Sequence, residues 1–128
     1  VIDDSYNASP RSFRAAIDVL ANRSGRKILV MGDMGELGDD SVNMHSDVGA
    51  YALEAGIDAL YAVGDLSANA CAAFGGNHFQ SKELLATAVS QELVRATADN
   101  RPVTFLVKGS RSAGMEKIVE HLITRGNS

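Results

Sequence analysis

Short, continuous apolar runs that alternate with amphipathic helical stretches constrain the fold of this chain more than any other feature. Residues Lys27–Met31 form such a run, as expected for a strand buried on both faces of a parallel sheet. Similar runs occupy Ala59–Val63 and Val103–Val107, and apolar residues recur at helical spacing between them. This alternation predicts an α/β fold with a mostly parallel sheet and helices on both faces.

The remaining predicted elements follow the same order. We expect a first strand ending at Val1-Ile2 and a short fourth strand at His78–Gln80. The first predicted helix is Pro10–Arg23, with Ser9 as N-cap, and the second carries an apolar stripe from Met44 to Ala55 and ends at Gly56. An alanine-rich helix follows and ends near Phe74. Ser81 caps the next helix, and a last helix carries Met115 to Ile123. Cys71 lies in the alanine-rich helix and is expected to be a buried, unreactive thiol.

The length and charge of the chain exclude several classes of protein. Its 128 residues, 45% of them apolar, suffice for one domain with one core. With 12 basic against 16 acidic residues, neither nucleic acid nor an anionic membrane is an expected partner. No apolar run approaches the ~20 residues of a membrane span, so we expect a cytoplasmic protein. The chain lacks an initiator Met and opens like a strand already under way, which predicts a fragment of a longer polypeptide.

Three polar loops follow predicted strands, at Asp3–Ser9, Gly32–Asp40 and Lys108–Ser112. Right-handed crossovers place the loops that follow parallel strands at one edge of the sheet, where open α/β sheets bind their ligands. Any one of these loops alone could be only a solvated connection. Their convergence at one edge predicts a ligand site.

The first and last of these loops suit different parts of a ligand. Asp4, at a strand end, could accept hydrogen bonds from both ribose hydroxyls, and Asn7 could contact the edge of a base; alternatively, Asp4 or Ser9 only caps the following helix. Lys108 and Arg111 flank a glycine at a predicted helix N-terminus, which favours a carboxylate or phosphate. The alternative is two solvated basic side chains.

The middle loop is a poor phosphate cradle despite its glycines. From Gly32 onward it reads Gly-x-x-Gly-x-x-Gly, which differs from both the dinucleotide-binding pattern and the P-loop. Asp33 and Glu36 would repel phosphate and better suit a cation, an ammonium group or a hydroxyl. His45 follows early in the next helix, a position where histidines are more often structural than catalytic.

A flavodoxin-like receiver domain of response regulators is an alternative for the whole chain. Asp3-Asp4, Asp65 and Lys108 lie close to the positions of the two acids and the lysine of that family. However, Asp65 lies beyond the end of its strand, and Lys108 is followed by glycine in place of proline.

Several blocks of the chain together resemble the C-terminal domain of the Mur ligases that add D-alanyl-D-alanine. The blocks are Asp3–Pro10, Gly32–Gly38 with His45 downstream, Val63-Gly64, and Val107–Ser112 with Met115-Glu116. They occur in order, at the spacing of the family, over essentially the whole chain.

This resemblance implies that residues 1–128 are one Rossmann-like domain, the third of a three-domain ligase of peptidoglycan synthesis. The N-terminal domain would hold UDP-N-acetylmuramoyl-tripeptide, and the central domain would carry the P-loop and the Mg²⁺ ligands. In that family ATP converts the peptide carboxylate into an acyl phosphate, which the amine of D-alanyl-D-alanine attacks. The fragment alone is therefore expected to be inactive, and the resemblance assigns it no metal ligand and no certain catalytic residue.

The resemblance also implies roles for residues of the three loops. Asp4 would hold the ribose of ATP, and Asn7 would lie by the adenine. Lys108, Ser110 and Arg111 match the Lys-Gly-Ser-Arg block and would bind the carboxylate of the dipeptide or the phosphates.

The acids of the middle loop would form one side of the closed cleft. Asp33 and Glu36, together with His45, would face the incoming ammonium group or hold the domain shut. The sequence does not distinguish between these two roles.

Overall fold

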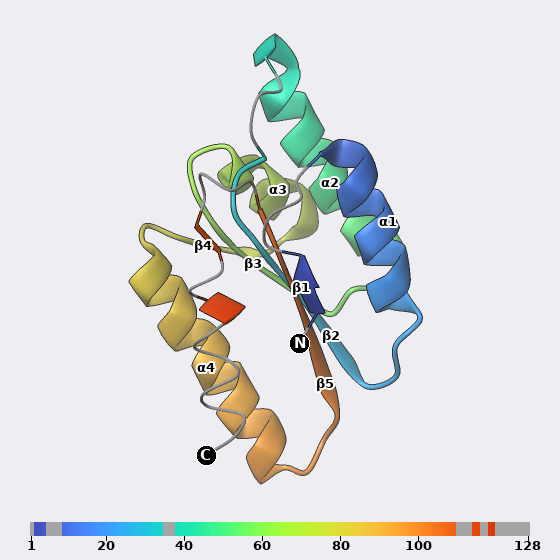
Figure 1. The fold of residues 1–128 in the computed structure, drawn as a ribbon, viewed down its shortest axis with the longest axis vertical. Coiled ribbons are helices and arrows are strands. Elements are labelled where there is room, and N and C mark those ends of the chain that lie inside the picture. Colours follow the sequence, from blue (N-terminus) through green and yellow to red (C-terminus); the bar gives the residue numbers. More distant parts are fainter. Residues whose placement is uncertain (1, 5–8, 35–37, 110–113, 116–117, 120–128) are drawn as a thin grey trace.

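A five-stranded, entirely parallel sheet forms the centre of the computed structural model (Figure 1), which describes residues 2–4, 9–34, 38–109, 114–115 and 118–119. The strands are β1 (Ile2–Asp4), β2 (Arg26–Met31), β3 (Ala59–Val63), β4 (Asn77–Phe79) and β5 (Val103–Lys108). Their order across the sheet is β1-β5-β2-β3-β4. The predicted α/β class and parallel sheet are thus confirmed.

Helices cover both faces of the sheet. They are α1 (Pro10–Ala21), α2 (Ser41–Glu54), α3 (Ser67–Phe74) and α4 (Lys82–Ala98), and a single 3-10 turn at Gly38–Asp40 precedes α2. In Figure 1, α1, α2 and α3 lie together on one side and α4 lies on the other. Within the described ranges, none of the helices is long and apolar enough to cross a membrane.

The strand side chains alternate between two cores, which explains the continuous apolar runs. In β2, Leu29 and Met31 pack with residues of α1, α2 and α3, whereas Ile28 and Val30 pack with residues of α4. All four side chains are completely buried. A strand in this position has no solvent-facing side, so its sequence shows no polar alternation.

The predicted helix starts follow from side-chain caps. The Ser9 hydroxyl accepts a hydrogen bond from the Ser12 N–H at 3.1 Å, and the Ser12 hydroxyl accepts one from the Ser9 N–H at 2.9 Å. This reciprocal pair, followed by Pro10, starts α1 at the predicted residue. Ser81 caps α4 with a single hydrogen bond, which its hydroxyl accepts from the Leu84 N–H at 3.2 Å.

Element ends differ from the predictions by a few residues. The strand predicted to stop at Ile2 continues to Asp4, because β1 pairs with β5 and Asp4 lies opposite Lys108. The fourth strand begins and ends one residue earlier than predicted, and α1 ends at Ala21 instead of Arg23. The predicted last helix lies mostly outside the described residues, although residues 118–119 are helical.

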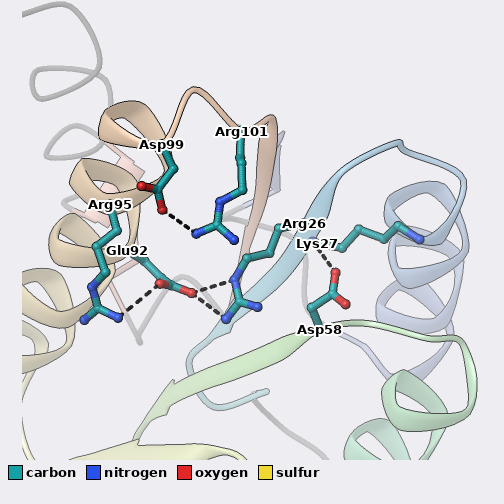
Figure 2. A network of polar contacts seen from close by, with 7 residues as sticks. All are labelled: Arg26, Lys27, Asp58, Glu92, Arg95, Asp99 and Arg101. Carbon is teal, nitrogen blue, oxygen red and sulfur yellow. Dashed lines mark hydrogen bonds and ion pairs between the residues drawn. The ribbon is translucent and has the colours of Figure 1, made fainter.

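Ion pairs tie α4 to the amino end of the sheet (Figure 2). Arg26, the first residue of β2, contacts one carboxylate oxygen of Glu92 through two nitrogens, at 2.6 and 2.7 Å. Arg95 lies 3.9 Å from the other oxygen of Glu92, and Arg101 pairs with Asp99 at 2.8 Å. These pairs lie where β2 and β5 begin, at the opposite end of the strands from the predicted site.

Gly49→Ala tests the close contact between α2 and α3. A Cβ at Gly49 would lie 2.8 Å from the carbonyl carbon of Ala70 and would overlap its oxygen. The helices must then move apart, so we expect a loss of about 1–3 kcal/mol in the free energy of unfolding. Urea denaturation measures this loss. Ala50→Ser, on the exposed side of α2, is the control and should change stability by less than about 0.5 kcal/mol. An unchanged or raised stability of Gly49→Ala would contradict the close contact.

Candidate functional site at the carboxyl edge of the sheet

The strand order places the starts of the three predicted loops side by side. β5 lies between β1 and β2, and the Cα partners of Lys108 are Asp4 on one side and Met31 on the other. The loops that follow these strands therefore start from three neighbouring positions on the same edge. The Gly32 N–H donates a hydrogen bond to the carbonyl of Lys108 at 2.9 Å, which continues the pairing of β2 with β5 into the loop.

Some of the predicted site residues lie outside the described part of the chain. These are Asn7, Glu36, Ser110 and Arg111. Asp4 is described by its backbone alone, as the last residue of β1. Of the predicted side chains, the structure thus places those of Asp33, His45 and Lys108.

Asp33 caps a helix that belongs to another loop. Its carboxylate accepts hydrogen bonds from the Ser67 N–H at 2.8 Å and the Ser67 hydroxyl at 2.7 Å, and lies 3.4 Å from the Leu66 N. The N-cap residue of α3, Leu66, makes no side-chain cap of its own, and the helix begins at Ser67. A carboxylate at this end also interacts favourably with the helix dipole, so Asp33 links the loop after β2 to the start of α3.

Gly64 makes room for this cap. It follows β3 with a φ of +107°, and a Cβ at this position would lie 2.7 Å from one carboxylate oxygen of Asp33. Any larger residue would both strain the backbone and displace the carboxylate. The Val63-Gly64 block therefore has a steric explanation.

His45 is completely buried, and both of its ring nitrogens are engaged. Nε2 lies 3.0 Å from the Met34 N–H, and Nδ1 lies 2.6 Å from the carbonyl oxygen of Ser41. The imidazole thus contacts the chain both before and after the segment that carries Glu36.

Lys108 is also completely buried, at the end of β5. Its Nζ lies 5.2 Å from the centre of the Phe13 ring, beneath α1, within the range of a cation–π interaction. Because side chains alternate along a strand, Lys108 faces the same side as Leu106, toward α1 and away from α4.

Other reactive side chains do not extend this site. Burial raises the pKa of the Cys71 thiol to about 11, which fits the expected unreactive cysteine. Across the described ranges, no three His, Cys, Asp or Glu side chains gather in a group that could hold a metal ion.

Sequence reasoning missed two partners in this site, Ser67 and Phe13. Ser67 follows Gly64 by three residues at the start of a helix, and this spacing could have indicated a capped turn. Nothing in the sequence around Phe13 indicates that its ring lies beside a buried lysine, since its helical spacing predicts only a core position.

The strand order does not support the receiver alternative. In the flavodoxin-like order 2-1-3-4-5, the first and third strands are neighbours, which brings their acids together. Here β5 and β2 separate β1 from β3. Two strands therefore lie between the strand that leads to Asp65 and the strand that carries Asp3 and Asp4.

Comparison with known proteins identifies relatives along nearly the whole chain. Residues 1–111 match the family described as "Mur ligase, glutamate ligase domain". The UDP-N-acetylmuramoyl-tripeptide--D-alanyl-D-alanine ligase of Escherichia coli (strain K12) is 45% identical over 127 residues, which cover 98% of this chain and 27% of that protein. The chain spans about a quarter of the length of the relatives that it matches.

Solved structures of similar fold belong to the same group of ligases. A crystal structure of MurF from Acinetobacter baumannii superimposes with a TM-score of 0.85 at 36% identity, covering 95% of this chain and 27% of that one. The MurF ligase from Thermotoga maritima in complex with ADP shares the fold, with a TM-score of 0.77 at 24% identity over 96% of this chain and 27% of that one.

Asp33→Ala tests the helix cap. Without the carboxylate, the Ser67 N–H and hydroxyl lose their acceptor, so we expect the free energy of unfolding to fall by about 1–2 kcal/mol. A double-mutant cycle with Ser67→Ala, measured by urea denaturation, should give a coupling energy of at least about 0.5 kcal/mol. Asp47→Ala, on an exposed face of α2, is the control. Strict additivity of Asp33→Ala and Ser67→Ala would contradict the cap.

Proposed function

The chain belongs to the Mur ligase family, and from this premise we propose that it is the C-terminal domain of a ligase that joins D-alanyl-D-alanine to UDP-N-acetylmuramoyl-tripeptide. The observation that carries this proposal is the likeness of nearly the whole chain to ligases named for that reaction. The reaction belongs to peptidoglycan synthesis, and we place it in the bacterial cytoplasm. The N-terminal and central domains of the same enzyme are the proposed partners of this one.

The proposed cofactor is ATP, which supplies the phosphoryl group that activates the tripeptide carboxylate for attack by the amine. Asp4 ends a strand at the ligand-binding edge, a suitable place for a carboxylate that holds a ribose. We assign the ribose to Asp4 and the adenine to Asn7. Mg²⁺ is assigned to the central domain, because this chain carries no P-loop sequence.

The loop after β5 is the proposed anion site. In the sequence, Ser110 and Arg111 come shortly after Lys108, the last residue of β5 and the partner of Asp4, and they would bind the dipeptide carboxylate or the phosphates. Lys108 belongs to the same sequence block, but its buried position beside Phe13 favours a supporting role beneath this loop.

The loop after β2 is the proposed acidic side of the cleft. The contacts of Asp33 and His45 with other parts of the domain favour a role in shaping this loop for domain closure. Glu36 stays the proposed partner of the incoming ammonium group, because opposite charges attract strongly in a closed, water-poor cleft.

The 128-residue chain by itself should catalyse no reaction. We expect neither ATP hydrolysis nor ligation above the buffer control, because the P-loop and the Mg²⁺ ligands are assigned to the central domain. A coupled ADP-release assay, with the complete ligase as positive control, measures both activities. ATP-dependent turnover by the isolated chain would contradict this domain assignment.

Arg111→Ala in the complete ligase tests the anion site. Loss of a charge-assisted hydrogen bond to the dipeptide carboxylate should raise the KM for D-alanyl-D-alanine roughly 10- to 100-fold, with the KM for ATP unchanged. Arg101→Ala is the matched control, because Arg101 is exposed at the opposite end of the sheet. An unchanged dipeptide KM with a raised ATP KM would assign Arg111 to the phosphates instead.

A further inference from the structure

His45 connects the two ends of one loop through a single side chain. Its Nε2 contacts the N–H of Met34, the last described residue before the loop, and its Nδ1 contacts the carbonyl of Ser41, at the start of α2. At the start of α2, the Ser41 hydroxyl also donates a hydrogen bond to the Gly38 carbonyl at 2.7 Å. The imidazole therefore fixes the separation between Met34 and the first residue of α2.

The partners of His45 determine which nitrogen carries its proton. A backbone N–H can only donate, so Nε2 must offer its lone pair to Met34. A carbonyl oxygen can only accept, so Nδ1 must carry the hydrogen that faces Ser41. This arrangement requires a neutral imidazole in the Nδ1–H tautomer, and it leaves neither nitrogen available to a substrate.

The loop is anchored at three successive residues, each to a different element. Gly32 bonds to β5, Asp33 caps α3, and Met34 bonds to His45 in α2. The Met34 side chain is buried as well, with 2% of its surface exposed. A loop held in this way starts from a fixed position, which lowers the entropy that must be lost when it binds a ligand.

We propose that His45 is a positioning residue that acts as a staple: it holds Met34 against Ser41 at the start of α2, and thereby fixes Asp33 and Met34 at the carboxyl edge of the sheet, where the dipeptide substrate is proposed to bind. The staple itself follows from the contacts of His45, whereas the identity of the substrate rests on the proposed function. His45 touches no reacting atom in this proposal, because its side chain has no exposed surface.

The tautomer can be measured without any assumption about function. Long-range ¹H–¹⁵N correlation spectra of the 128-residue chain should show His45 as a neutral imidazole protonated at Nδ1. His78 is the internal comparison, because its Nε2 lies 2.8 Å from the Gly64 carbonyl and must therefore carry the hydrogen. A His45 ring protonated at Nε2 would overturn the staple, whatever reaction the enzyme performs.

Kinetics of the complete ligase test the positioning role. His45→Ala leaves the buried Met34 N–H without an acceptor, so kcat/KM for D-alanyl-D-alanine should fall on the order of tenfold. The KM for ATP should stay unchanged, because the nucleotide is assigned to the loop after β1. In His45→Gln the side-chain oxygen can replace Nε2 as acceptor, so this variant should stay within about threefold of the wild type.

Other outcomes decide against the proposal. If both variants lose activity alike at temperatures where they are fully folded, His45 has a direct chemical role. If neither variant loses activity, His45 is only a core residue. If His45→Ala does not fold, the proposal is tested by the other two measurements. A His45→Gln variant that loses activity while folded, or a ring protonated at Nε2, would then contradict it. A wild-type enzyme that does not ligate D-alanyl-D-alanine would refute the proposed function. The contacts of His45 would then be tested by the tautomer measurement alone.

Discussion

The candidate site depends on the insertion of β5 between β1 and β2. Backbone hydrogen bonds of this parallel pairing hold the last residues of the three strands side by side, with Lys108 between Asp4 and Met31. Three loops that are far apart in the sequence therefore leave the sheet from neighbouring positions. The pairing also extends one residue beyond β2, through the Gly32 N–H, so the acidic loop begins in register with β5.

The loop after β2 combines acidic residues with contacts to three other elements of the domain. The Asp33 carboxylate is directed into the domain, where it caps α3, and His45 closes the base of the loop. Gly64 is part of the same arrangement, because a side chain there would displace the carboxylate. Two side chains that the sequence presents as ligand candidates, Asp33 and His45, are thus engaged in contacts within the domain, where they fix the start of the loop.

The two ends of the sheet differ in the contacts of their charged side chains. At the amino end, Arg26 and Glu92 form a close ion pair that holds α4 against β2, and exposed pairs surround it (Figure 2). At the carboxyl end, Lys108 is buried beneath α1 beside Phe13. In open α/β sheets, ligands bind outside the carboxyl ends of the strands.

The sequence by itself determined the α/β class, the parallel sheet, most element positions and the starts of α1 and α4, because these depend on local periodicity and on caps within a few residues. It also identified three loops that begin at one edge of the sheet. Only the tertiary structure decided that Asp33 caps α3, that His45 joins Met34 to Ser41, and that Lys108 lies under Phe13. Asp33–Ser67 and Lys108–Phe13 join residues far apart in the chain, and the direction of each side chain is set by packing that no local pattern encodes.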